Sequence, residues 1–274
     1  MKREKLVVVV PVYKEACELQ SYELLSIRNT LEKTPTTTPI CLIGPEGLAF
    51  NEYLELFNYS FIQQTFESKF FSSIYSYNNL LKSLSFFTAF EAFESMLVVQ
   101  TDAYIFDFDF EPFMGYDFIG GPWQQHIFDT HIKTLHCGNG GFSLRNIPKA
   151  IQVLKQDIQA LPLRKIRRYT FESEFHTNKN FFEKAWDTLY FYFFQNSLKD
   201  GKNGLPFIYE DVFWSLIVPV VYPEFKIPDG HTALQFAFDT QPEICYQQNH
   251  RRLPKGCHGF NKYSPDFWRQ FIPF

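Results

Sequence analysis

Residues 6–12 read LVVVVPV, and this segment decides the fold class. Its apolar side chains run without alternation, which is typical of a strand buried on both faces, as in a parallel sheet. Apolar spacing then predicts a helix over 18–32 and short strands over 39–44 and 96–99. Strands that alternate with helices in this way indicate an α/β protein with an open, mostly parallel, twisted sheet flanked by helices.

Further elements are expected along the rest of the chain. They are strands over 59–64 and 142–145, and helices over 78–93, 148–160, 180–196 and 210–217, the last ending near Pro219. A second apolar segment over 103–106 follows the strand over 96–99. No internal repeat or low-complexity linker divides the sequence. We therefore expect 1–274 to form a single compact domain, with a nucleotide-binding half over 1–102 and a half over 103–274 that completes the cleft.

Composition excludes several classes of protein. The chain has 26 basic and 30 acidic residues, a net charge of −4, which argues against a dedicated nucleic-acid binder. Five cysteines without a CxxC pair are typical of reduced thiols in a cytoplasmic protein. Apolar runs are too short to span a bilayer, and the N-terminal run lacks a cleavage site. The 33 phenylalanines reflect either a compositional bias or an aromatic surface for sugars or lipid.

Acidic residues at a strand end are the first candidate site. No GxGxxG motif follows the first strand and no Walker lysine loop is present. In open α/β sheets ligands bind outside the carboxyl ends of the strands, and Asp102 follows the strand over 96–99. It suits a divalent cation, or else it caps the next turn. Asp107 and Asp109 form a literal DxD, but we interpret them as turn acids in a solvated loop.

Two other segments combine polar and glycine residues. Residues 138–141 read GNGG, which either lets the backbone approach a ligand, with Asn139 bonding sugar hydroxyls, or forms a tight loop before a strand. Trp123 follows two glycines and a proline, and either stacks on a sugar or fills the core. Glu210 and Asp211 open a helix, where the macrodipole favours acids and the ionised form of Asp211.

Histidines and basic residues near the C-terminus form the last group. His258 lies in a glycine-rich loop and is either a surface residue or a ligand, and His231 is a less favoured ligand. Basic side chains just before His258 are candidates to neutralise phosphates: Arg251, Arg252 and Lys255. Three other histidines have a spacing that fits no common helix face, so we assign them to loops: His126, His131 and His136.

Five motifs occur in a fixed order. They are QTDAYIF at 100–106, YDFIGGPW at 116–123, GNGGFSLR at 138–145, YEDVFWS at 209–215 and GCHGF at 256–260. Together they resemble a widespread family of bacterial and fungal proteins classed as glycosyltransferase-like, with the GT-A fold. The resemblance implies a nucleotide-sugar donor, UDP-sugar above all, and a glycan or lipid-linked acceptor. It also implies a divalent metal, Mn²⁺ or Mg²⁺, and a role in cell-surface polysaccharide synthesis.

The resemblance also implies roles for individual residues. GT-A enzymes carry DxD where this chain has QTD, so Asp102 keeps the metal role, His258 completes the site, and the loss of the first acid puts strict metal dependence in doubt. An inverting mechanism would use Asp211 as general base and Glu210 to position the acceptor, with Trp123 also at the acceptor. The implied donor-binding residues are Pro11, Val12, Tyr13, Lys82, Thr101, Asp102, Asn139, Gly140 and Gly141.

Two other functions remain open from the sequence. One is a non-catalytic carbohydrate-binding protein on a decayed transferase scaffold, which the missing first acid of DxD favours and the Glu210-Asp211 pair argues against. The other is a nucleotidyltransferase, which usually carries a glycine-rich basic loop after the first strand, and PVYKEACE at 11–18 lacks one.

A basic cluster followed by an aromatic segment predicts contact with a membrane. The cluster is Lys155, Arg164, Lys165, Arg167 and Arg168, and residues 181–194 are rich in aromatics. The alternative is that the basic residues form a solvated surface beside a helix of the core. We expect the protein to be peripheral at the inner face of the membrane. It should bind anionic vesicles at low salt and dissociate from them at high salt. Sedimentation with liposomes measures this, and equal binding to neutral and anionic vesicles would contradict it.

Overall fold

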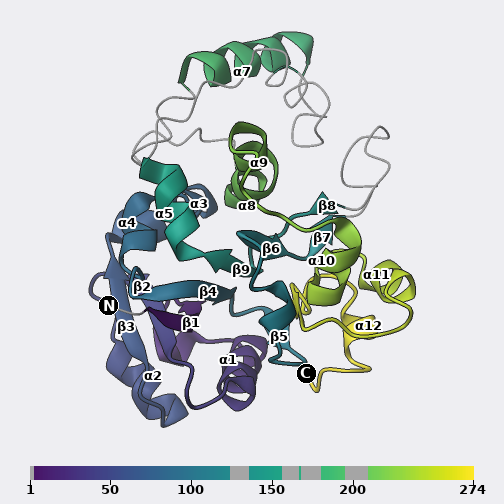
Figure 1. Ribbon diagram of the computed structural model, residues 1–274. Helices are drawn as coiled ribbons and strands as arrows, with labels where there is room; N and C mark the ends of the chain where they lie inside the picture. Colours follow the sequence, from purple (N-terminus) through teal and green to yellow (C-terminus); the bar gives the residue numbers. More distant parts are fainter. Residues whose placement is uncertain (1–2, 124–135, 156–166, 168–179, 195–208) are drawn as a thin grey trace.

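A six-stranded sheet forms the centre of the protein (Figure 1). The computed structural model describes residues 3–123, 136–155, 167, 180–194 and 209–274. The strand order is β3-β2-β1-β4-β9-β6. The strands are β1 Glu4–Pro11, β2 Ile40–Pro45, β3 Ile62–Phe66, β4 Phe93–Val99, β6 Phe118–Gly120 and β9 Phe142–Asn146.

Most strand pairs of this sheet are parallel. β1 lies between β2 and β4 and is parallel to both, and β2 is parallel to β3. β9 is antiparallel to both of its neighbours, β4 and β6. The four consecutive valines Val7 to Val10 are almost fully buried, as expected for a strand covered on both faces. The prediction of an α/β protein with an open, mostly parallel sheet is confirmed.

Helices cover both faces of the sheet. The helices up to residue 155 are α1 Ser21–Lys33, α2 Phe50–Phe57, α3 Ile74–Leu80, α4 Leu84–Thr88 and α5 Ile147–Lys155. Figure 1 shows α3, α4 and α5 on one side and α1 and α2 on the other. α1 begins with a capping box, in which Gln20 and Glu23 each satisfy the other's backbone N–H group.

The predicted helix over 78–93 is wrong. Two short helices, α3 and α4, replace it, and β4 already begins at Phe93. The break falls at Ser83, whose hydroxyl accepts the Phe86 N–H at 3.1 Å and so caps α4. A serine that bonds the backbone in this way favours the start of a helix over its interior, and apolar spacing alone does not show this.

A second, three-stranded sheet joins the C-terminal region to the main sheet. It has the order β10-β11-β5, with β5 Ala103–Ile105, β10 Ala237–Phe238 and β11 Gly256–His258. β11 runs antiparallel to β5, and His258 is paired with Ala103. This register places the imidazole of His258 beside Asp102. A two-stranded pair, β7 Pro122–Trp123 with β8 His136–Cys137, lies near the sheet edge.

The helical run that starts at Glu210 is longer than expected. It comprises α8 Glu210–Val212, a π-helical turn over Phe213–Ile217, and α9 Val218–Val221. Pro219 was expected to end the helix, but the run continues through it, and Pro219 lies directly after the π-helical turn in the first turn of α9. The remaining helices are α7 Phe181–Phe194, α10 Gly230–Phe236, α11 Pro242–Gln248 and α12 Pro265–Trp268.

Many phenylalanines fill the interior. Phe86 and Phe87 are fully buried and meet edge to face, and Phe87 packs in the same way on Trp214 of the helical run. A smaller group of large apolar side chains is exposed: Tyr13, Leu56, Ile62, Ile74, Tyr75, Phe181, Phe182, Trp186, Leu189, Ile244, Tyr263 and Phe274. Most of the described aromatic side chains therefore build the core. This agrees with a compositional bias towards phenylalanine better than with a dedicated aromatic surface for sugars or lipid.

Part of the sequence-based analysis lies outside the described residues. This applies to Arg164, Lys165 and Arg168 of the basic cluster, to His126 and His131, and to the predicted helix beyond Lys155. Lys155 and Arg167 are exposed, and the aromatic segment forms helix α7 as expected. In the part of the chain that the structure describes, no helix is both long and apolar enough to cross a bilayer. Membrane contact stays a prediction.

Truncating Phe87 should destabilise the core. We expect Phe87→Ala to lower the free energy of unfolding by about 3–5 kcal/mol, because a fully buried ring leaves a cavity against Phe86 and Trp214. Phe182, which is 81% exposed, supplies the control, and Phe182→Ala should change the value by less than about 0.5 kcal/mol. Urea titration measures both, and equal losses would contradict the assignment of Phe87 to the core.

Candidate active site

One cavity collects most of the predicted site residues. It has a volume of about 470 Å³ and lies at the carboxyl ends of β1 and β4. The predicted residues that line it are Pro11, Tyr13, Thr101, Asp102, Asn139, Gly140, Gly141, Glu210, Asp211 and His258. Lining residues that the sequence analysis did not select include Tyr22, Glu23, Tyr77, Asn78, Gln100, Tyr209 and Lys262. The rule that ligands bind at strand ends therefore located this cavity.

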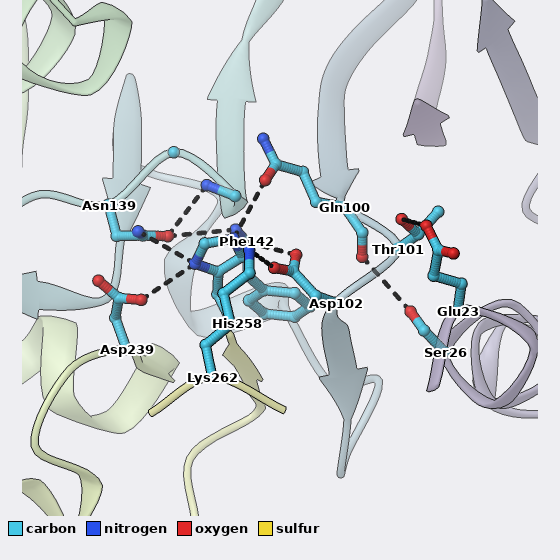
Figure 2. A network of polar contacts seen from close by, with 12 residues as sticks. Glu23, Ser26, Gln100, Thr101, Asp102, Asn139, Phe142, Asp239, His258 and Lys262 are labelled. Atoms are coloured by element: carbon cyan, nitrogen blue, oxygen red, sulfur yellow. Dashed lines mark hydrogen bonds and ion pairs between the residues drawn. The ribbon is translucent and has the colours of Figure 1, made fainter. Parts of the chain in front are cut away.

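His258 is the centre of a polar network (Figure 2). Its Nε2 lies 3.1 Å from Asp102 Oδ1 and 3.0 Å from Gln100 Oε1, and its Nδ1 lies 3.0 Å from Asp239 Oδ1. Burial works against the charged imidazole, but the two carboxylates outweigh it and raise the pKa of His258 to about 10. The protein without ligand therefore carries an imidazolium between two aspartates.

Asp102 has a second cationic partner. The Lys262 ammonium contacts Asp102 Oδ2, while His258 contacts Oδ1. Burial on its own would raise the pKa of Asp102, but these two partners hold it below its usual range. The Lys262 side chain lines the cavity and is largely exposed. The sequence analysis did not select it, and its position four residues after His258 was the only feature that could have indicated a role in the site.

The glycines of the 138–141 loop make room for protein side chains. A Cβ atom at Gly141 would lie 2.2 Å from the His258 ring, and one at Gly140 would lie 1.6 Å from Glu210 Oε1. Asn139 closes the loop, since its Oδ1 accepts the Gly141 N–H at 2.9 Å. The expected close approach of backbone is thus found, but it is an approach to His258 and Glu210.

The donor atoms around His258 fit a divalent cation. Ligand atoms in neighbouring positions around an octahedral ion with bonds near 2.1 Å are about 3.0 Å apart. The separations of His258 Nε2 from Asp102 Oδ1 and from Gln100 Oε1, 3.1 Å and 3.0 Å, match that spacing. Within the described residues no cluster of three His, Cys, Asp or Glu side chains converges, so the third protein ligand would be an amide oxygen. Phosphate oxygens of a ligand would complete such a site.

Glu210 is locked in a buried ion pair. Its Oε2 lies 2.8 Å from Arg145 Nη1, and its Oε1 accepts from Arg145 Nη2 at 2.9 Å. Arg145 Nη2 also donates to the Gly140 carbonyl at 3.1 Å, and Asn78 Oδ1 accepts the Glu210 N–H at 2.6 Å. The ion pair therefore connects the start of α8 to the 138–141 loop, and the Glu210 N–H group connects it to α3. The acceptor role of Glu210 stays a prediction.

Asp211 differs from the expectation for a helix start. Its Oδ1 accepts the Val212 N–H at 2.8 Å, which favours the carboxylate. Burial works the other way and is the larger effect, and the neighbouring Glu210 adds to it, so the pKa of Asp211 rises to about 7. The expectation that helix position would favour the ionised form is wrong, because the loss of solvent outweighs the N–H group.

Three predicted residues lie outside the lining of the cavity. Val12 is buried, and Trp123 is buried with its ring against Gly138. Lys82 is also buried; burial lowers its pKa to about 8, although Glu210 and Asp211 partly oppose this. Lys82 therefore lies in the field of the Glu210-Asp211 pair, and a direct diphosphate contact stays a prediction.

The alternative metal ligands and the other basic candidates are on the surface. Asp107 and Asp109 are exposed, both pair with Lys255, and neither lines the cavity. Asp107 Oδ1 accepts the Asp109 N–H at 3.3 Å, as expected of turn acids. The other exposed candidates that do not line the cavity are Arg251, Arg252 and His231.

The comparison with protein families gives a clear assignment. A family model described as "Protein of unknown function (DUF5672)" matches residues 60–258, which is well over half of the chain. The chain belongs to the DUF5672 family. The matched region contains Asp102, Glu210, Asp211 and His258, whereas Lys262 lies just beyond it. No curated protein matches this DUF5672 chain.

Solved structures show distant likenesses. Mouse xyloside xylosyltransferase 1 aligns at 12% identity with a TM-score of 0.48, covering 93% of this chain and 97% of that one. The glycosyltransferase GlyE of Streptococcus pneumoniae TIGR4 aligns at 10% identity with a TM-score of 0.44, covering 93% of this chain and 54% of that one.

Breaking the Arg145–Glu210 pair should cost stability. We expect Glu210→Gln to lower the free energy of unfolding by about 3–5 kcal/mol, because it leaves the buried guanidinium without a counter-ion. Asp107→Asn, which breaks the exposed pair with Lys255, is the matched control and should cost at most about 1 kcal/mol. Urea titration measures both. Replacing both partners with Met should recover much of the loss, and a double variant as unstable as Glu210→Gln would contradict this account.

Proposed function

We propose that this protein is a glycosyltransferase that moves a sugar from a nucleotide-sugar donor, of which a UDP-sugar is the first choice, to a hydroxyl group of a glycan or lipid-linked acceptor. One observation carries the proposal. Asp211, a partly buried carboxyl group with a pKa of about 7, lines the same cavity as the Asp102, His258 and Gln100 cluster. A proton acceptor and a site suited to a diphosphate thus share one cavity.

Asp211 would act as the general base. A base works best when its pKa lies near the operating pH, because it is then partly ionised and still holds a proton well. Asp211 would take the proton of the acceptor hydroxyl as that oxygen attacks the anomeric carbon. The bond between the anomeric carbon and the phosphate oxygen breaks, and the nucleoside diphosphate leaves. Attack from the face opposite the leaving group inverts the anomeric centre.

The Asp102 side of the cavity would bind the donor. Asp102, His258 and the amide oxygen of Gln100 would hold Mn²⁺ or Mg²⁺. Such a cation would supply positive charge for the diphosphate leaving group. Lys262 contacts Asp102 from the exposed side of the cavity, and its ammonium suits the same phosphates. Tyr13 and Pro11, at the end of β1, line the cavity where the resemblance implies the nucleotide base.

The acceptor would enter beside α8. Tyr209 precedes the Glu210-Asp211 pair and lines the cavity, and its ring lies 6.2 Å from that of the exposed Tyr75. Aromatic rings and a hydrogen-bonding base are groups that recognise a sugar hydroxyl and its ring face. Glu210, fixed by Arg145, holds Asp211 at this position whether or not it also contacts the acceptor.

Hydrolysis of nucleotide sugars is the first test. A panel of UDP-, GDP-, CMP- and dTDP-sugars with Mn²⁺ should contain at least one donor that the protein hydrolyses slowly, because water takes the place of the acceptor. A donor at one hundred times its Kd should also stabilise the fold by about 2.7 kcal/mol in a thermal-shift assay. Binding of a free sugar without hydrolysis of any donor would favour a carbohydrate-binding protein instead.

Asp211→Asn should remove the base. With the donor found above, we expect kcat to fall by about 10² to 10⁴-fold while donor affinity is kept, because the amide cannot take a proton. The wild-type kcat/KM should rise with pH through a pKa of about 7, and the variant should lack this rise. Steady-state kinetics measures both, and a variant that keeps more than about a tenth of kcat points to a retaining mechanism.

A measurement of the melting temperature tests whether this variant is folded. The pKa of Asp211 is raised from 3.8 to about 7, so the folded state holds its proton more tightly than the unfolded state. Its contribution to stability is therefore present below pH 3.8 and is lost as pH rises through about 7. Asn cannot ionise, so Asp211→Asn should melt at a higher temperature than the wild type above that pH. Lost activity with gained stability separates catalysis from folding.

A further inference from the structure

Asp239 is a buried carboxylate that the proposed chemistry does not use. It follows strand β10 directly and is only 5% exposed. A buried carboxylate needs a partner, because its removal from water is expensive. The partner is His258, whose Nδ1 lies 3.0 Å from Asp239 Oδ1. Figure 2 shows Asp239 on the side of the imidazole opposite to Gln100 and Asp102.

The surroundings decide where the imidazole carries its proton. A carboxylate accepts hydrogen bonds, so the contact with Asp239 requires the proton to be on Nδ1 of His258. Asn139 is the other polar group near Nδ1, at 3.3 Å through its Nδ2. Its Oδ1 already accepts the Gly141 N–H, so the group that faces His258 is a donor and offers Nδ1 no acceptor. The Nδ1 proton therefore goes to Asp239. Without a cation, Asp102 Oδ1 and Gln100 Oε1 accept a second proton on Nε2, and a cation bound between them would take the place of that proton.

A neutral imidazole with its proton on Nδ1 has its lone pair on Nε2. That atom faces Asp102 Oδ1 at 3.1 Å and Gln100 Oε1 at 3.0 Å, the two oxygens that suit a cation. Histidines that bind metals usually donate their other N–H group to a carboxylate or carbonyl, which fixes the tautomer and the ring orientation. The geometry around His258 has this form.

We propose that Asp239 is a positioning residue for a divalent cation: it holds His258 in the Nδ1–H tautomer and aims Nε2 at the site shared with Asp102 and Gln100. This inference rests on the metal site of the proposed function. Asp239 itself does not touch the cation or the substrate in this arrangement. Its effect is on the affinity for the cation, and groups in this position typically change metal affinity by about 10 to 100-fold.

Binding of Mn²⁺ tests the proposal without any substrate. The free-ion signal in electron paramagnetic resonance gives the Kd for Mn²⁺ alone and for Mn²⁺ with excess UDP. We expect Asp239→Ala to weaken Mn²⁺ by about 10 to 100-fold, and Asp239→Asn to weaken it less, because the amide oxygen still accepts the Nδ1 proton. His258→Ala should bind at least as weakly as Asp239→Ala. Asp266→Ala, at an exposed aspartate of α12, is the matched control and should bind like the wild type.

Nitrogen NMR shifts of the His258 imidazole, recorded with Mg²⁺, give a second readout. The wild type should show a protonated Nδ1 and a metal-bound Nε2, and Asp239→Ala should show a mixture of tautomers. A purely structural role for Asp239 would lower the melting temperature and leave both readouts unchanged, which would overturn the proposal. A wild type that binds no Mn²⁺ under either condition would also overturn it, and His258 would then be the cation of the site.

This test and the test of the proposed function can fail separately. If no nucleotide sugar is hydrolysed but Mn²⁺ still binds and depends on Asp239, the positioning role stands and the transferase activity does not. If a donor is turned over but Asp239→Ala keeps the wild-type Kd for Mn²⁺, the transferase proposal stands and the role of Asp239 is wrong.

Discussion

The antiparallel pairing of β11 with β5 is the contact on which the candidate site depends. It sets His258 opposite Ala103, next to Asp102, although more than 150 positions separate the two site residues along the chain. A shift of one residue in this register would turn the imidazole to the other face of the small sheet. Gly141 completes the constraint, because any side chain there would occupy the space of the His258 ring.

Ion pairing in a poorly solvated cavity explains how the other polar groups are held. Arg145 binds Glu210 through both carboxylate oxygens and the 138–141 loop through a carbonyl, so one guanidinium joins the start of α8 to this loop. Burial makes such a pair costly to break and of little net benefit to stability. Its effect on the structure is to fix the start of α8, where Asp211 lies.

Two acids that line the same cavity differ in pKa because only one of them has cationic partners that outweigh burial. Asp102 has His258 and Lys262 as cationic partners, and its pKa is held below its usual range. Asp211 lies beside Glu210, whose charge and the burial of Asp211 raise its pKa to about 7. One carboxylate is thus suited to hold a cation and the other to move a proton. Helix position, the electrostatic factor used in the sequence analysis, predicted the wrong direction for the pKa of Asp211, because burial and the adjacent Glu210 outweigh it.

The sequence by itself determined the parallel part of the sheet and ten of the 21 described residues that line the cavity. The uninterrupted valines of β1 indicated a strand buried on both faces, and strand ends pointed to Asp102, because local spacing is enough to decide burial and position at an edge. The break at Ser83 was missed because a capping hydrogen bond leaves no apolar pattern. Only the tertiary structure decided that Asp239 faces His258, that Arg145 holds Glu210, and that Asp211 is hard to ionise. These properties depend on contacts between distant segments and on loss of solvent, neither of which is encoded in the spacing of residues along one segment.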